Sequence, residues 1–544
     1  MRGRAAKPAE LLTLLSLLTA LTVPTGCSIH NRTESALKRV PVSPPRSVCV
    51  LFFDGLSHEA FEHLVTSGAL PNMKRELVDR GLVVDTAVAS IPSETYPNLS
   101  GMLTGLFPGH HGIPANVWLD RRMHHHEAHT NIFRTWSAAS YLEPEARTLY
   151  ERLPADTVAV TTPIAKGATV QSKNLVSLMA SFARNDWTFL DRKTIDDVGD
   201  AYVGAFGARK LPSLVWGHLL GPDEVAHSDG PDSAAFRMTM SSADRAFGRL
   251  VRRLKRRGIY DHVLFVLIGD HGNAPYTQFV DADELVHRAL FSHPAAADCI
   301  TGDCTLVTPP PAGKGHQKFD VGNAQIAVGA YRGVMIWLPA TRDPENIPLA
   351  FRNRKGKGRK QRSVTIVKSM PPPSSFAAAL AQLPEIEIVV TRGAEAGQVE
   401  IYGAHGRGLI VREDFENRPS RYRYEVLEGI DPTGYATHEA VKPMLGGSHS
   451  ADEWLDATLS TSYPDLVVQL AEYFDSPRAP DVYFSPKDGF GFKAGKAAGH
   501  GGLARREMIV PLIFAGPGVV PGHRKSARSI DLAPTLLQYL GVPF

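Results

Sequence analysis

The sequence has few cysteines, almost no excess of charge of either sign, and only one long apolar run. Four of its 544 residues are cysteine, too few for the disulfide framework that holds small secreted domains together. Its formal net charge of +3 gives no reason to expect a nucleic-acid partner. With 43% hydrophobic and 21% charged residues, the composition is that of a soluble globular protein, and the length allows several domains or one large domain with an insert.

The long apolar run lies near the N-terminus, from Leu11 to Val23. Basic residues precede it and small residues lead from it to Cys27, which is the pattern of a secretion signal. The run is shorter than the roughly 20 residues that span a bilayer. The segment resembles a bacterial lipoprotein signal, in which Cys27 would be lipidated, although Pro24 replaces the usual aliphatic residue. A plain secretory peptide and an uncleaved anchor are the alternatives, and all three predict an exported protein of the periplasm or cell envelope.

The other cysteines fit an oxidising compartment. Cys299 and Cys304 flank a short polar loop and can close a small disulfide. A zinc site is the alternative, but no third ligand lies nearby in the sequence. Cys49 lies inside an apolar run, so we expect a buried free thiol.

Short apolar runs alternate with amphipathic stretches along much of the chain. Ser47–Phe53 and His262–Ile268 are continuous apolar runs, which predict strands buried on both faces of a parallel sheet. The expected helices around them are His58–Leu82 and Ser241–Arg257, and a strand at Val510–Phe514 and a helix at Ile530–Leu540 are expected near the end. Alternating strands and helices predict an α/β domain.

The segment from 320 to 455 differs, because β-rich pieces dominate it, and we interpret it as an α+β insert. Within it, Arg352–Arg362 carries seven basic residues without interleaved aromatic residues, which favours a solvated loop over a nucleic-acid surface. The predicted organisation is a signal (1–27), a linker (28–46), a catalytic core in two parts (47–319 and 456–544) and the insert between them (320–455).

Several metal-ligating residues stand at places where α/β folds build their sites. Asp54 directly follows the first expected strand, and Asp270 and His271 directly follow the later one. Asp223 and His227 are four residues apart and can face the same way on one helical turn, which suits two ligands of one metal. A helix cap with a surface histidine is the alternative for that pair.

Two further segments carry candidate residues. Thr95 stands just before an expected helix start, where its hydroxyl would face free backbone N–H groups and the positive end of the helix dipole. A simple Thr cap is the alternative. His500 is flanked by Gly499 and Gly501, which let the backbone approach a crowded site.

Together these motifs resemble the alkaline phosphatase superfamily, in particular its type I phosphodiesterase/nucleotide pyrophosphatase family. The resemblance extends from Val48 to Pro543 and implies a three-layer αβα sandwich with a mostly parallel central sheet and a smaller α+β insert. It rests on Leu51–Gly55, Pro92–Asn98, Thr104–Pro108, His111–Ile113, Asn116, Asp223 with His227, Gly269–Gly272, Gly499–Gly501, Val510–Gly516 and Asp531–Thr535.

The resemblance also implies two bound Zn²⁺ ions and a covalent mechanism. One zinc would be held by Asp223, His227 and His500, and the other by Asp54, Asp270, His271 and the Thr95 hydroxyl. Mixed carboxylate and imidazole ligands suit zinc, with manganese or iron as alternatives at one site. Thr95 would be the nucleophile, Asn116 would contact the phosphate, and Tyr96 would stack on the substrate.

The expected substrate is a small phosphoester, a nucleotide or another phosphodiester. No Lys-x-Arg pair lies between Asn116 and Asp223, and relatives that cleave monoesters tend to have one, so a phosphodiesterase is favoured over a phosphomonoesterase. The segment around Thr95 lacks the Cys/Ser-x-Pro-x-Arg pattern of sulfatases. A lipoprotein that only binds its ligand is the third alternative, which the complete ligand set disfavours.

Overall fold

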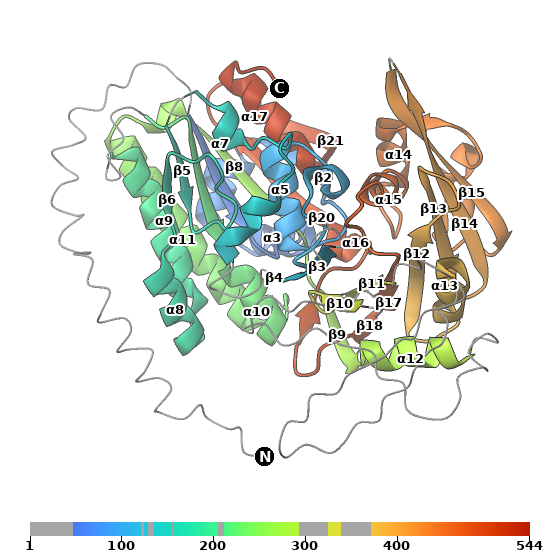
Figure 1. Ribbon diagram of the computed structural model, residues 1–544. Coiled ribbons are helices and arrows are strands. Elements are labelled where there is room, and N and C mark those ends of the chain that lie inside the picture. The colour runs from blue at the N-terminus through green and yellow to red at the C-terminus, as the bar shows by residue number, and fades with distance from the viewer. Residues whose placement is uncertain are drawn as a thin grey trace, which may run out of the picture.

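A computed structural model describes residues 47–120, 125–128, 135–154, 156–204, 211–292, 325–338, 372–416 and 418–544. The predicted signal with Cys27, the linker, the Cys299–Cys304 pair and the basic run 352–362 lie outside these ranges. Two eight-stranded sheets form the molecule, the central sheet and the second sheet, with helices against both (Figure 1). No helix within the described ranges has the length and apolarity that a membrane crossing requires.

The central sheet has the strand order β21-β2-β20-β8-β1-β7-β5-β6. Only β20 runs antiparallel to its neighbours, so the sheet is mostly parallel, as predicted. Its strands are β1 (Ser47–Phe53), β2 (Leu82–Val88), β5 (Thr157–Val160), β6 (Val170–Ser172), β7 (Leu214–Leu219), β8 (Val263–Gly269), β20 (Ile509–Ala515) and β21 (Gly522–Arg528).

Alternation along β1 explains why helices cover both faces of this sheet. Val48, Val50 and Phe52 point into one hydrophobic cluster, which contains side chains of α5 and α17. The intervening residues, among them Cys49, point into a second cluster with side chains of α3, α9 and α11. A strand apolar at every position can be buried only between two helical layers, so the three-layer αβα sandwich is confirmed. Cys49 is a buried free thiol, as predicted.

The helices and helical turns are α3 (His58–Thr66), α4 (Pro71–Met73), η1 (Lys74–Val78), α5 (Thr95–Thr104), α6 (Pro108–His111), η2 (Thr135–Tyr141), α7 (Leu149–Arg152), α8 (Leu175–Arg184), α9 (Trp187–Tyr202), α10 (Gly221–Asp229), α11 (Ala234–Arg256), η3 (Tyr260–His262), α12 (Ala282–Ser292), α13 (Pro373–Ala381), η5 (Tyr435–Thr437), η6 (Lys442–Met444), α14 (Ala451–Thr458), α15 (Leu466–Tyr473), α16 (Arg505–Met508), η7 (Ser529–Asp531) and α17 (Leu532–Leu540).

Two helix predictions differ from the structure. The single helix expected over His58–Leu82 is wrong, because α3 ends at Thr66 and Gly68 adopts a left-handed φ of 75°. The chain restarts at Pro71, which suits the first position of a helix. The helix expected to begin at Ser241 begins at Ala234, because Ser233 caps it by accepting a hydrogen bond from Phe236 N–H.

The second sheet is antiparallel throughout, with the order β10-β11-β17-β12-β13-β14-β15-β16. Helices α12 and α13 share a hydrophobic cluster with it. Strand β17 belongs to this sheet although it lies within 456–544, and the predicted domain boundaries stay a prediction. The strands are β10 (Gln325–Gly329), β11 (Gly333–Trp337), β12 (Ile386–Arg392), β13 (Gln398–Gly403), β14 (Gly406–Phe415), β15 (Arg418–Gly429), β16 (His449–Ser450) and β17 (Val482–Pro486).

The β10–β11 hairpin forms the edge of the second sheet that lies nearest the central sheet (Figure 1). Its turn pairs with the segment that carries His500, through a bridge between Tyr331 and His500. Two small sheets complete the fold, formed by β18 (Gly489–Gly491), β9 (Ala274–Phe279) and β19 (Ala498–Gly499), and by β3 (Val117–Asp120) with β4 (His125–Ala128).

Candidate active site

Three neighbouring strands of the central sheet end at the candidate site. Asp54 follows β1, Asp270 and His271 follow β8, and helix α10, with Asp223 and His227, follows β7. In the sheet, Phe53 is paired with Gly269 on one side and with Leu219 on the other. The structure therefore brings these side chains together at one carboxyl edge, as the sequence pattern predicts.

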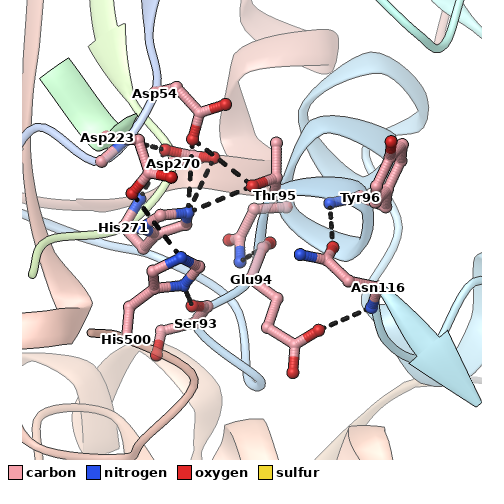
Figure 2. A network of polar contacts seen from close by, with 12 residues as sticks. Asp54, Ser93, Glu94, Thr95, Tyr96, Asn116, Asp223, Asp270, His271 and His500 are labelled. Carbon is pink, nitrogen blue, oxygen red and sulfur yellow. Dashed lines mark hydrogen bonds and ion pairs between the residues drawn. The ribbon is translucent and has the colours of Figure 1, made fainter. Parts of the chain in front are cut away.

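Thr95 lies at one side of this group, against Asp54 and His271. Its hydroxyl oxygen Oγ1 is 3.3 Å from Asp54 Oδ1 and 3.3 Å from His271 Nε2 (Figure 2). Thr95 is the first residue of α5, and Glu94 occupies the cap position without a capping side-chain bond. The alternative that Thr95 is a simple helix cap is therefore wrong.

The start of α5 offers fewer free N–H groups than expected. Tyr96 N–H donates to Asn116 Oδ1 at 2.9 Å, and Pro97 has no N–H to offer. Because Asn116 Oδ1 accepts this bond, the side chain of Asn116 is oriented with its N–H groups on the other side of the amide. The predicted phosphate cradle of backbone N–H groups and the phosphate contact of Asn116 both stay predictions.

Asp223, His227 and His500 form the first group of possible metal ligands, with ligand atoms within 4.8 Å of one another. His227 Nε2 lies 3.3 Å from one Asp223 oxygen and His500 Nε2 lies 3.6 Å from the other. The Nδ1 atoms of the two histidines face the carbonyl oxygens of Ala498 and Ser93, at 2.9 and 2.6 Å. Those contacts place the proton on Nδ1 and leave Nε2 free to bind a metal.

Asp54, Asp223 and His271 form the second group, again within 4.8 Å. Asp270 borders it, with Oδ2 3.2 Å from His271 Nε2. The other oxygen of Asp270 accepts from the backbone N–H groups of Gly55 and His271. Asp223 thus borders both groups, which the sequence pattern did not indicate.

The buried carboxyl groups of Asp54, Asp223 and Asp270 form a cluster that a bound cation would stabilise. Burial raises the pKa values of Asp54 and Asp270 well above their usual range, and the neighbouring carboxylates raise them further. Within the described ranges, none of the three carboxylates has an ion pair with Lys or Arg, and Asp270 Oδ2 is buried without a hydrogen-bond partner. Carboxylates buried in this way bind metals or pair with bases, so the donor set fits divalent metal ions.

Two residues that support the ligands were missed by sequence reasoning. His218 Nε2 donates to Asp54 Oδ2 at 2.8 Å, and burial lowers the pKa of His218 to about 3, so it is neutral. Asn273 donates to Asp223 Oδ1 at 3.0 Å. The sequence did contain a signal for each of them. His218 is the single ionisable residue in the apolar strand β7, and Asn273 is an amide two positions after His271.

Glu94, beside Thr95, was also missed. Its Oε2 accepts a hydrogen bond of 2.5 Å from Asn116 N–H, which holds the backbone of the predicted phosphate-contacting residue. Its Oε1 faces Gly329, where an added Cβ would lie 1.9 Å away. Burial raises the pKa of Glu94 to about 7. A side chain at Gly329 would therefore require the Glu94 side chain to move away from its present position.

Tyr96 is 7% exposed and belongs to the hydrophobic cluster around α5. Its hydroxyl donates to Thr135 Oγ1 at 3.3 Å. The buried ring offers little surface to a substrate, and its stacking role stays a prediction.

The αβα sandwich thus places carboxylates, imidazoles and a threonine hydroxyl together at the carboxyl edge of its central sheet. Residues 48–324 match the family model described as type I phosphodiesterase/nucleotide pyrophosphatase, and the chain belongs to this family. The resemblance recognised in the sequence is confirmed.

Individual relatives agree with this assignment. The chain is 25% identical over 257 residues to an uncharacterized pyrophosphatase/phosphodiesterase of Schizosaccharomyces pombe, covering 45% of this chain and 49% of that protein. It is 27% identical over 222 residues to ectonucleotide pyrophosphatase/phosphodiesterase family member 3 of Mus musculus, covering 39% and 23%. The chain thus spans about half or less of the length of these curated relatives.

Solved structures show the same fold. Murine ectonucleotide pyrophosphatase/phosphodiesterase 5 superposes with a TM-score of 0.53 at 16% identity, covering 91% of this chain and 95% of that one. An inactive variant of the murine protein, in complex with AMP, superposes with a TM-score of 0.51 at 16% identity, covering 92% and 95%.

Proposed function

We propose that this protein is an exported, two-zinc phosphodiesterase/nucleotide pyrophosphatase that acts through a covalent phospho-threonine on Thr95. The observation that carries the proposal is the position of the Thr95 hydroxyl, 3.3 Å from both Asp54 and His271 at the start of a helix. Family membership supports the reaction class, and the buried carboxylates support the use of metals.

The chain supplies ligands for two ions. Asp223, His227 and His500 would hold the first, and Asp54, Asp270, His271 and Thr95 the second, with Asp223 bordering both. When bound, the metals supply positive charge that favours ionisation of the hydroxyl and offsets charge on the phosphoryl group. His218 and Asn273 orient the Asp54 and Asp223 carboxylates.

The residues themselves then perform two displacements. Thr95 Oγ1 attacks phosphorus, its proton passes to solvent, and the bond to the leaving oxygen breaks. A water molecule next attacks the phospho-threonine, the bond from phosphorus to Thr95 breaks, and the hydroxyl regains a proton. Throughout, the Asn116 amide orients a nonbridging oxygen, and Glu94 holds the Asn116 backbone in place.

Nucleotides are the proposed substrates. The bound AMP of the structurally similar murine protein and the ectoenzyme names of the relatives support a nucleotidyl group. Export and anchoring through Cys27 rest on the N-terminal pattern.

The test is a kinetic comparison of purified, zinc-loaded protein on bis-p-nitrophenyl phosphate, p-nitrophenyl phosphate and p-nitrophenyl sulfate. We expect kcat/KM to be highest for the diester and to fall by about 10³-fold or more in Thr95→Ala, as for loss of a covalent nucleophile. Thr95→Ser, which keeps a hydroxyl, is the matched control and should retain part of the activity.

A preference for the monoester would move the protein to the phosphomonoesterase branch. Full activity in Thr95→Ala would overturn the covalent mechanism, and zinc binding without turnover of any ester would favour the ligand-binding lipoprotein.

A further inference from the structure

The turn of the β10–β11 hairpin is built against the candidate active site. His500 N–H donates to Ala330 O at 2.9 Å, and Arg332 N–H donates back to His500 O at 3.0 Å. The Arg332 side chain is buried and donates to Phe490 O at 2.6 Å. A strand pair of the second sheet therefore fixes the backbone of a proposed zinc ligand.

The backbone of this turn is strained. Ala330 and Tyr331 have φ values of 42° and 79°, in the left-handed region that side chains other than glycine rarely adopt. Such conformations persist only where the surrounding contacts impose them, and they concentrate at functional sites. Tyr331 is a bulky residue in a position that glycine would occupy without strain.

The Tyr331 ring lies against the first metal group. Its centroid is 4.7 Å from that of the His227 ring, in an edge-to-face arrangement. The charges of Asp223 and Glu224 both act on the Tyr331 hydroxyl. The Tyr331 residue is only partly buried.

A lysine stands over the same ring. Lys496 Nζ is 5.6 Å from the Tyr331 centroid, a cation–π distance. Three backbone hydrogen bonds hold the loop that carries Lys496. Phe492 N–H donates to Tyr331 O at 2.8 Å, and Ala497 N–H donates to His227 O at 2.9 Å. The third is the bond from His500 N–H to the hairpin described above. Within the described part of the chain, no carboxylate lies at ion-pair distance from Lys496, and the charge of Glu224 acts on it from farther away.

The position of Thr95 decides which part of a substrate would meet these residues. Thr95 lies against Asp54 and His271, so an in-line attack directs the leaving oxygen away from them, toward Asp223, His227 and His500. Tyr331 and Lys496 lie beside that group. An ammonium beside that group, without a carboxylate at ion-pair distance among the described residues, fits a negatively charged leaving group.

We propose that Tyr331 and Lys496 form a leaving-group subsite, in which the Lys496 ammonium binds an anionic phosphate or pyrophosphate leaving group and Tyr331 positions that lysine. The proposal rests on the proposed function and adds a specificity to it: substrates whose leaving group is a phosphate or pyrophosphate are preferred over esters whose leaving group carries no phosphate. The second sheet then takes part in catalysis, because the hairpin that holds the subsite belongs to it.

The experiment compares two substrates that share one nucleotidyl group. Thymidine 5′-triphosphate releases pyrophosphate, whereas thymidine 5′-monophosphate p-nitrophenyl ester releases p-nitrophenolate. In the full-length zinc-loaded protein we expect Lys496→Ala to lower kcat/KM for the triphosphate by about 10- to 100-fold, as for a lost hydrogen bond between charged groups. For the p-nitrophenyl ester, kcat/KM of Lys496→Ala should stay within about threefold of the wild-type value. Lys496→Arg should restore most of the activity on the triphosphate.

Matched variants separate the subsite from an effect on folding. Lys525→Ala removes the same charge from an exposed position on β21 and should leave kcat/KM unchanged for both substrates. Tyr331→Gly removes the ring and relieves the left-handed strain, so it should keep its zinc content and its melting temperature while lowering triphosphate turnover selectively.

The outcomes are distinguishable. An equal loss on both substrates, or no loss on the triphosphate, would overturn the subsite while leaving the proposed function intact. A wild-type protein that hydrolyses neither substrate would overturn the proposed function and the subsite together.

Discussion

At the scale of single residues, the proposed metal ligands are oriented by partners that are not ligands themselves. His218 is neutral, 2% exposed, and donates to the Asp54 oxygen that does not face Thr95. Such a donor orients a carboxylate and keeps its second oxygen available. The sequence showed Asp54 because it follows a strand, but the partner comes from the neighbouring strand, and only the register of β1 against β7 brings it near.

His218→Phe should lower zinc affinity about 10- to 100-fold, because Asp54 loses its orienting donor while the ring volume is kept. Zinc affinity is measured by competition with a chromophoric chelator, together with kcat/KM on the diester. His63→Phe changes an exposed histidine on α3 and is the control. Unchanged affinity in His218→Phe would show that Asp54 is oriented without this bond.

At the scale of elements, helices α9 and α10 meet through a buried carboxyl group. Asp191 on α9 is 1% exposed, accepts from Gly221 N–H at 3.1 Å, and has no partner for its second oxygen within the described ranges. An added Cβ on Gly221 would lie 2.1 Å from that second oxygen, which explains the glycine at the start of α10. Burial raises the pKa of Asp191 to about 7.

Asp191→Asn should stabilise the protein at pH 8 and lose this advantage at pH 5. The unfolded aspartate ionises near pH 4 and the folded one near pH 7, so the wild type loses stability as the pH rises between these values. Asparagine stays neutral and keeps an acceptor for Gly221 N–H. We expect the difference in unfolding free energy to grow by on the order of 2–4 kcal/mol across this range, measured by urea titration, and a constant difference would exclude a raised pKa.

At the scale of the whole molecule, metal binding should contribute to stability. Asp54, Asp223 and Asp270 come from separate elements and gather with no Lys or Arg partner in the described ranges. Without cations their repulsion and desolvation oppose folding. The two metals would therefore hold together the ends of β1, β8 and α10 and the segment after β19.

Removing zinc with a chelator should lower the melting temperature and abolish activity, and both should return on adding zinc. At free zinc about 1,000-fold above Kd, binding contributes about 4 kcal/mol. His500→Ala should reduce the bound metal from two ions to one, measured by elemental analysis, with part of the stabilisation lost. A melting temperature indifferent to zinc in the wild type would contradict this account.

Sequence alone determined the buried strands and placed the candidate ligands at their carboxyl edge, because continuous apolar runs specify strands with two covered faces and the candidate residues follow those strands directly. The helix break at Gly68 and the early start of α11 were missed, because turn and capping contacts outweighed periodicity there. Tertiary structure alone decided that Asp223 borders both metal groups, that Glu94 holds Asn116, and that Tyr331 reaches His227. These contacts join residues distant in the chain, and strand register and hairpin position, which no local pattern encodes, bring them together.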